Sequence, residues 1–84
     1  MTKDEIFVTI KKSIIDVLPL VEDQDISPEK QLVDLGANSI DRSEIVISSM
    51  AAIQVKVAPS ELGKAKNIQS LIDIFYEASV GDVK

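Results

Sequence analysis

Apolar residues recur at spacings of three and four in three separate stretches of this 84-residue chain. That spacing is the period of an α-helix and not of a strand. The stretches span residues 3–18, 38–53 and 67–79, and each begins beside a residue suited to capping: Thr2, Asn38 and Asn67. Each helix is expected to bury one apolar stripe. The expected stripes are Phe7, Ile10, Ile14 and Val17 in the first helix, with Ile6 and Leu18 alongside; Ile40, Ile47, Met50 and Ile53 in the second, with Val46 beside them; and Ile68, Leu71, Ile72, Phe75 and Tyr76 in the third.

The segment between the first two stretches lacks a sustained period but is not purely polar. Its apolar residues predict a long ordered loop that is attached to the core at intervals, with one short helical turn at residues 27–30. A further brief helix is expected at residues 59–63. These apolar loop residues are Leu20, Val21, Ile26, Leu32, Val33 and Leu35.

Together these elements predict an all-α fold, a small irregular four-helix bundle of three longer helices and one short third helix, with the long ordered loop between the first two. We expect residues 1–84 to form a single domain and the end from about residue 80 to fray.

Composition excludes several classes of function. The chain has no cysteine and no histidine, so it lacks a thiol nucleophile, an imidazole base and the usual zinc ligands. A net charge of -5 opposes binding to nucleic acid, no stretch is apolar enough to span a membrane, and the start is too polar for a signal peptide. We therefore expect a cytoplasmic, monomeric protein.

One acidic segment resembles a calcium loop only superficially. Asp23 and Asp25 have suitable spacing, but the sixth position is Pro28 instead of glycine and the twelfth is Asp34 instead of glutamate. No metal site is expected.

The most informative local feature is Ser39, which stands where a turn containing Gly36 meets the second predicted helix. Asn38 and Ser39 are both favoured at a helix start, so a plain capping role is the simplest interpretation. A helix start also presents free N–H groups and the positive end of the helix dipole, which would favour a phosphate esterified to Ser39. We expect Leu35 and Ile40 to bury on either side and fix the direction of Ser39.

The order of these elements, together with the sequence Leu-Gly-x-Asn-Ser-Ile at residues 35–40, resembles the acyl carrier proteins over nearly the whole chain. The resemblance implies that Ser39 is the attachment site of 4′-phosphopantetheine, transferred from coenzyme A by a phosphopantetheinyl transferase. It implies a carrier and not an enzyme, because catalysis belongs to the partner enzymes and no catalytic residue is expected. A chain without cysteine would thereby gain a thiol that holds an acyl group as a thioester.

Two departures from the common family pattern flank this serine: Asn38 replaces the usual aspartate and Ile40 the usual leucine. Beyond them Arg42 lies between Asp41 and Glu44, and residues 45–53 carry no charge, whereas ordinary carriers place repeated acids there. The residues expected to dock partners are Asn38, Ile40, Asp41, Arg42 and Glu44. For Asp41 and Glu44, complementing the helix dipole is the competing interpretation, and for Arg42 a weak surface ion pair.

Residues 38–45 and 65–68 resemble a subgroup, the freestanding donor carriers of bacterial polyketide pathways of the bacillaene type. This resemblance implies an acyltransferase that loads malonyl, a decarboxylating ketosynthase-like enzyme that converts it to acetyl, and a hydroxymethylglutaryl-synthase-like enzyme that uses the acetyl for β-branching in antibiotic biosynthesis. The alternatives are a fatty-acid or ordinary polyketide extender carrier, and a non-enzymatic helical interaction module in which Ser39 is only a cap.

The uncharged run at residues 45–53 has more apolar positions than one buried stripe requires. Most of it is expected in the core, but Val46, Met50 or Ile53 could line a partner-facing patch or a cavity for the acyl chain. Phe7, Phe75 and Tyr76 are expected to pack in or beside the core.

Overall fold

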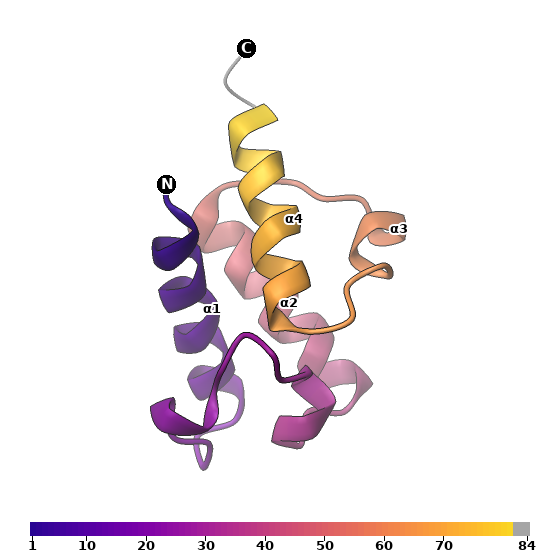
Figure 1. Ribbon diagram of the computed structural model, residues 1–84. Helices are drawn as coiled ribbons and strands as arrows, with labels where there is room; N and C mark the ends of the chain where they lie inside the picture. Colours follow the sequence, from indigo (N-terminus) through magenta and orange to yellow (C-terminus); the bar gives the residue numbers. More distant parts are fainter. Residues whose placement is uncertain (82–84) are drawn as a thin grey trace.

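A computed structural model describes residues 1–81 of the chain, and every element within that range is helical. In chain order the elements are α1 (Lys3–Val17), the 3-10 turns η1 (Asp23–Asp25) and η2 (Leu32–Leu35), α2 (Ser39–Ile53), the short α3 (Pro59–Leu62) and α4 (Ile68–Gly81). The predicted all-α class, with three longer helices and one short one, is confirmed (Figure 1).

The core lies where α1 packs against both α2 and α4. Each buried isoleucine removed from water contributes roughly 1.5–3 kcal/mol, and the interior is built mainly from such side chains. Its fully or nearly fully buried apolar members are Ile6, Ile10, Ile14, Ile26, Leu32, Ala37, Ile45, Ile53, Val55, Ile68, Leu71, Ile72 and Phe75.

The ends of the long helices follow the predicted capping chemistry. At α1, Thr2 Oγ1 accepts from the Glu5 amide at 3.1 Å, and the Glu5 carboxylate accepts from the Thr2 amide at 2.8 Å. At α4, Asn67 Oδ1 accepts from the Ser70 amide at 2.9 Å. Because these bonds satisfy otherwise free amides of the first turn, the starts of both helices are fixed locally by sequence.

Predictions about the buried stripes succeed for α4 and partly fail for α1 and α2. In α4 the four predicted aliphatic and phenylalanine positions are buried and Tyr76 is half-buried. In α1 the stripe is rotated, with Ile6, Ile10 and Ile14 buried and Phe7 and Val17 only partly so.

The stripe predicted for α2 is wrong at two positions. Ile40 is 70% exposed and Ile47 is 61% exposed, whereas the fully or nearly fully buried residues are Ile45, Ser49 and Ile53, spaced by four. Hydropathy favoured the isoleucines, but only one face of α2 meets α1 and α4. The small Ser49 lies on that face and donates its hydroxyl to the Ile45 carbonyl at 2.8 Å, so its polar group is satisfied inside the core.

The long loop is ordered as predicted, and four of its six predicted apolar residues attach it to the core. Ile26 and Leu32 are buried, and Val21 and Leu35 pack partly against the core. The prediction is wrong for Leu20, which is 95% exposed, and for Val33, which is 53% exposed, while Ala37 is a further buried residue that was not predicted. The expected helical turn at residues 27–30 is only a hydrogen-bonded turn, and the 3-10 turns lie on either side of it. Hydrogen bonds from the Ile68 and Gln69 amides to the Lys30 and Pro28 carbonyls tie this turn to the start of α4.

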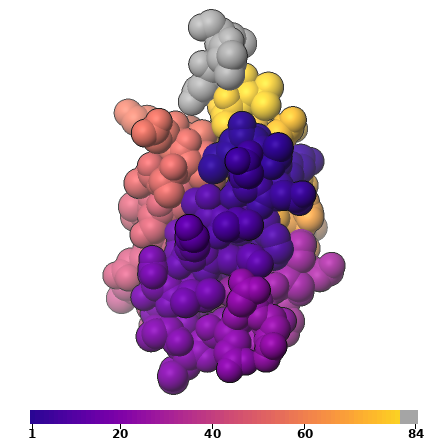
Figure 2. Space-filling model, turned by 90° about the vertical axis from the view of Figure 1, so that its left-hand side faces the viewer, coloured from indigo at the N-terminus to yellow at the C-terminus, as the bar shows by residue number. Residues whose placement is uncertain are grey.

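The space-filling view shows α1 running down one side of the molecule, with the start of the long loop packed around its lower end (Figure 2). On the opposite side of the core, α3 packs against α4. Fraying is expected from about residue 80, but residues 80 and 81 still belong to α4. The rest of this expectation falls on residues 82–84, which lie outside the described part of the chain. No helix within residues 1–81 is both long and apolar enough to cross a membrane.

Candidate functional site

Ser39 is the first residue of α2, and its side chain is exposed. The approach to it is rigid: Gly36 ends η2 with a φ of 92°, in the left-handed region that glycine adopts without strain. Ala37 follows, buried to 3% exposure, and its amide donates to the Leu32 carbonyl at 3.2 Å. Ser39 is therefore presented from an anchored backbone and not from a free loop.

Asn38 and Asp41 form a reciprocal capping box around this helix start. Asn38 Oδ1 accepts from the Asp41 amide at 2.8 Å, and the Asn38 amide donates to Asp41 Oδ2 at 3.3 Å. An amide oxygen accepts this bond as an aspartate would, so the departure from the family pattern keeps the cap. The capping box also explains why Asp41 is half-exposed, since its side chain is turned toward the helix start.

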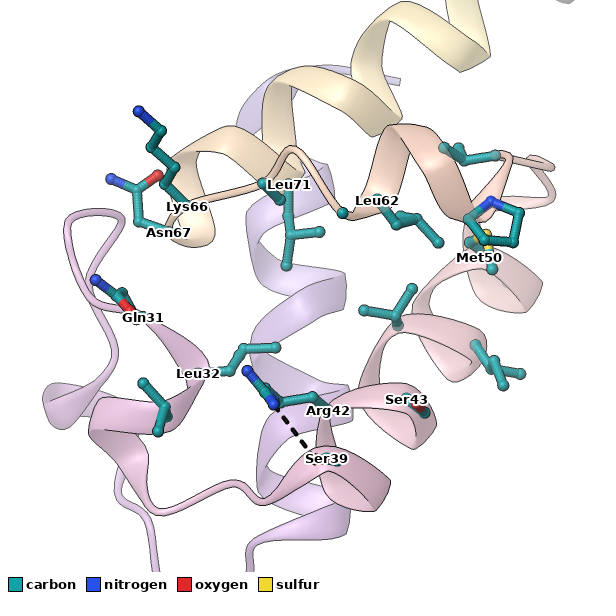
Figure 3. A pocket seen from close by; sticks show the side chains of 17 residues that line it. Gln31, Leu32, Ser39, Arg42, Ser43, Met50, Leu62, Lys66, Asn67 and Leu71 are labelled. Carbon is teal, nitrogen blue, oxygen red and sulfur yellow. Dashed lines mark hydrogen bonds between the residues drawn. The ribbon is translucent and has the colours of Figure 1, made fainter.

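Arg42 lies one helical turn beyond Ser39, and its guanidinium reaches back to the serine. Arg42 Nη2 donates to Ser39 Oγ at 3.5 Å, a long hydrogen bond between two exposed side chains (Figure 3). Within residues 1–81, Arg42 is the charged residue whose side chain is found in hydrogen-bond contact with the serine hydroxyl.

Beside Ser39 opens a groove of about 650 Å³ between η2, α2, α3 and the start of α4. Figure 3 shows Leu32, Leu62 and Leu71 projecting toward its centre, with Ser39 and Arg42 at one edge. Because its walls are mainly apolar, the groove is a more favourable environment for an acyl chain or a pantetheine arm than bulk water is. The lining residues are Gln31, Leu32, Val33, Ser39, Arg42, Ser43, Val46, Ile47, Met50, Val57, Pro59, Leu62, Gly63, Ala65, Lys66, Asn67 and Leu71.

The groove places two of the three residues that were expected either in the core or beside a cavity. Val46 and Met50 line it, while Ile53 belongs to the core. Sequence reasoning missed the opposite wall, formed by Leu32, Leu62 and Leu71. Each of these was a recognisable apolar position, but they come from three separate elements, and local periodicity carries no signal that brings them together.

The expected docking residues Asn38, Ile40, Arg42 and Glu44 are exposed around Ser39. The expectation that Ile40 buries beside the serine is wrong, whereas Leu35 does pack partly against the core. Ile40 and Ile47 are seven residues apart and so share one face of α2, which leaves an exposed apolar face with a charged residue, Glu44, between them.

Groups with shifted pKa lie away from this site. The Thr2 hydrogen bonds hold the pKa of Glu5 below its ordinary value, and the bond from Lys3 does the same for the pKa of Asp73. Residues 1–81 contain no cluster of three or more acidic side chains placed to hold a metal ion.

An exposed serine at a helix start, next to an apolar groove in a small helical bundle, is the arrangement that the resemblance to carrier proteins predicts. The family model described as phosphopantetheine attachment site matches residues 8–75. The chain therefore belongs to this family of acyl carrier proteins: it is a carrier and not a catalyst, and its cofactor is covalently attached 4′-phosphopantetheine.

The chain is also similar to individual acyl carrier proteins. The chain is 38% identical over 77 residues to the polyketide biosynthesis acyl-carrier protein AcpK of Bacillus subtilis (strain 168), covering 92% of this chain and 94% of that one. It is 29% identical over 77 residues to an acyl carrier protein of Petrotoga mobilis (strain DSM 10674 / SJ95), covering 92% and 91%.

A solved structure is similar in both fold and sequence. It is the crystal structure of the curacin biosynthetic pathway HMG synthase in complex with acetyl donor-ACP, matched with a TM-score of 0.80 and 35% identity. The match covers 89% of this chain and 96% of that chain.

Proposed function

We propose that Ser39 carries the 4′-phosphopantetheine arm, and that the loaded protein donates acetyl to a hydroxymethylglutaryl-synthase-like enzyme for β-branching in polyketide antibiotic biosynthesis. The observation that carries the first part is the exposed Ser39 hydroxyl on an anchored helix start, at the edge of an apolar groove. The attached group supplies a thiol that holds the acyl cargo as a thioester.

The residues around Ser39 suit attachment by a separate transferase. Ser39 Oγ would attack the β-phosphorus of coenzyme A; its new P–O bond replaces the bond to adenosine 3′,5′-bisphosphate, which leaves, and the hydroxyl proton passes to the transferase. Arg42, the one side chain found in hydrogen-bond contact with Ser39 within residues 1–81, is a cation and no base. The transferase must therefore supply the base, while the carrier supplies an accessible hydroxyl and a helix start that tolerates phosphate.

The donor role is supported by similarity to the acetyl donor-ACP, and the role in polyketide biosynthesis by similarity to AcpK. We infer that the partner docks around the start of α2, on Asn38, Ile40, Asp41, Arg42 and Glu44, and that exposed Ile47 extends the side formed by Ile40 and Glu44. An acyltransferase would load malonyl and a decarboxylating ketosynthase-like enzyme would convert it to acetyl before transfer. The carrier would act as a monomer in the cytoplasm, where coenzyme A is available.

Intact-mass measurement after incubation with coenzyme A and a broad-specificity phosphopantetheinyl transferase tests the attachment site. The native chain should gain one arm and Ser39→Ala none. Ser43→Ala is the matched control, since Ser43 is an exposed serine of the same helix that also lines the groove. Ser43→Ala should gain the arm normally. A mass gain in Ser39→Ala would overturn the assignment, and no gain in the native chain would leave Ser39 as an ordinary first residue of α2, a helix that Asn38 caps.

The donor role is tested by comparing acetyl transfer from two carriers to one synthase. Acetyl loaded on this protein and on a fatty-acid carrier is offered to the same β-branching synthase, and transfer is followed by mass. Faster transfer from this protein supports the proposal. Equal rates would favour the fatty-acid or ordinary extender role instead.

A further inference from the structure

The charged residues that line the groove are both cations. In a chain with 14 acidic and 9 basic residues, no aspartate or glutamate lines the groove, and its charged members are Arg42 and Lys66. An acid-free lining in an acidic protein favours an anionic group at the edge of the groove.

Arg42 has no carboxylate partner among the described residues. The reason is its register: residues three and four positions away on α2 are Asn38, Ser39, Ile45 and Val46, none of them acidic. Asp41, its acidic neighbour in sequence, is committed to the capping box with Asn38. The guanidinium is left with one long bond of 3.5 Å, to Ser39 Oγ.

A guanidinium presents five N–H donors in a planar fork that matches the oxygens of a phosphate. A neutral serine hydroxyl uses that fork poorly, as the 3.5 Å distance shows. A phosphodiester on the same Oγ places anionic oxygens beside it, and charge-assisted hydrogen bonds to phosphate are shorter and stronger than bonds to a neutral hydroxyl.

Figure 3 shows the guanidinium above Ser39, on the side that faces the groove and Leu32. A phosphate held there would lie at the edge of the groove, with the apolar walls beside it. Lys66 lines the groove too, but it extends from the loop before α4, at the far edge from Ser39 in this view.

We propose that Arg42 is a positioning residue for the prosthetic group: it binds the phosphodiester on Ser39 and turns the arm into the groove between η2, α2 and α3. This inference rests on the proposed attachment at Ser39 and adds to it. It gives Arg42 a role within the carrier itself, separate from any contact with a partner enzyme.

The test compares the holo forms of the native chain, Arg42→Gln, Arg42→Lys and, as the matched control, Lys66→Gln. Intact mass first establishes that each carries one arm, and circular dichroism that each is folded. The ³¹P chemical shift of the phosphodiester and nuclear Overhauser contacts from the arm to Val46, Met50 and Leu62 are then measured.

The native chain should show arm contacts in the groove, and its Arg42 Nε–Hε resonance should shift between the apo and holo forms. Arg42→Gln should move the ³¹P signal and lose most of the groove contacts, while Lys66→Gln should resemble the native chain. Arg42→Lys should keep only part of the contacts, because an ammonium lacks the planar fork.

Two results would overturn the inference: an unchanged ³¹P signal with full groove contacts in Arg42→Gln, or equal losses in Lys66→Gln, which would indicate a general charge effect. Failure of the proposed function is distinguished at the first step, because it would appear as absence of the arm from Ser39 in the native chain.

Discussion

Helices α2 and α4 are nearly equal in length, with 15 and 14 residues, but they use their apolar side chains differently. In α4 the predicted apolar stripe is buried from Ile68 to Phe75, which is fully buried, and within residues 68–80 only Val80 is an exposed large apolar residue. In α2 a serine is buried, while Ile40 and Ile47 remain largely exposed. The difference shows that α4 uses its apolar side chains mainly for packing, whereas α2 leaves two of them exposed, as the proposed docking of a partner on α2 requires.

The largest expected effect on stability comes from comparing a buried apolar residue of α4 with an exposed one of α2. Phe75→Ala should reduce the free energy of unfolding by about 3–5 kcal/mol, because it removes a fully buried ring and leaves a cavity. Ile47→Ala should change it by no more than about 0.5 kcal/mol, since that side chain is 61% exposed. Urea denaturation followed by circular dichroism measures both. Comparable losses in the two variants would remove the distinction between α2 and α4.

The same contrast explains what could be predicted from the sequence. The stripe of α4 was predictable because the predicted positions Ile68, Leu71, Ile72 and Phe75 are the ones that become buried, although Val80 beyond them is 55% exposed. The stripe of α2 was not, because the exposed Ile40 and Ile47 are as apolar as the buried Ile45 and Ile53, so hydropathy alone does not select the buried face. Hydropathy ranks Ile47 above Ser49, and only the position of α1 and α4 reverses that order.

Some features of the site could be predicted from the sequence and others could not. The capping pattern and the position of Ser39 at a helix start depend on neighbouring residues, so the sequence alone predicted them. The groove depends on Leu32, Leu62 and Leu71 meeting across the loop, α3 and α4. Such a meeting is set by tertiary packing, which no local pattern encodes.

The next effect concerns the serine in the core. Ser49→Leu should destabilise the protein by about 1–3 kcal/mol, since a larger side chain must enter a fully buried position. Ser49→Ala is the matched control, and its unfolding free energy should stay within about 0.5 kcal/mol of the native value, because alanine's higher helix propensity offsets the lost hydroxyl bond. Thermal unfolding measures both. A stabilised Ser49→Leu would show that the buried face of α2 has spare volume and is packed less fully than that of α4.

Smaller effects are expected where the two helices are alike. Each begins with an asparagine whose side chain accepts from a first-turn amide, Asn38 in α2 and Asn67 in α4. Asn38→Ala and Asn67→Ala should each cost about 1 kcal/mol of stability in urea denaturation. Asn38→Asp should be nearly neutral, because aspartate caps equally well. A loss confined to Asn67→Ala would mean that Asp41 alone holds the start of α2.

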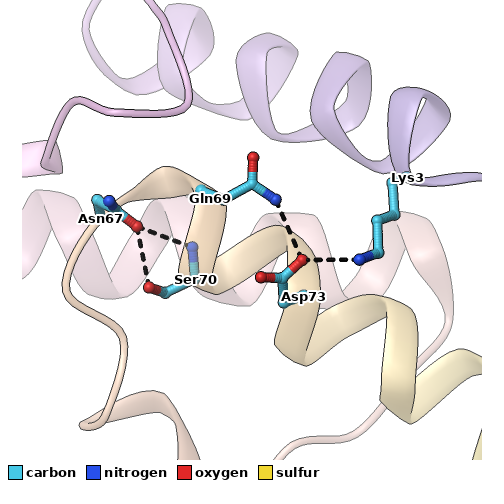
Figure 4. A network of polar contacts seen from close by, with 5 residues as sticks. All are labelled: Lys3, Asn67, Gln69, Ser70 and Asp73. Carbon is cyan, nitrogen blue, oxygen red and sulfur yellow. Dashed lines mark hydrogen bonds and ion pairs between the residues drawn. The ribbon is translucent and has the colours of Figure 1, made fainter.

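The smallest effect on stability is expected from an ion pair that links α4 to α1. Lys3 Nζ lies 3.0 Å from Asp73 Oδ1, and Gln69 Nε2 donates to the same oxygen at 3.1 Å (Figure 4). Lys3 also lies over the Tyr76 ring, 5.2 Å from its centroid. Both charged side chains are about half exposed, with 52% and 48% of their areas accessible, so solvent screens the pair. Its contribution should stay under about 1 kcal/mol.

The sign of its pH dependence follows from the direction of the shift. The bond from Lys3 lowers the pKa of Asp73 in the folded protein, so the folded state favours the carboxylate. That stability is present above the unfolded value of about 3.9 and is lost as the pH falls through the lower folded pKa. The stability difference between the native chain and Asp73→Asn should therefore be constant near neutral pH and shrink below about pH 3.9. Asp16→Asn, which removes an exposed α1 carboxylate with no ion pair in the described residues, is the charge-matched control. If its pH profile matched that of Asp73→Asn, the effect would belong to net charge and not to the link between α1 and α4.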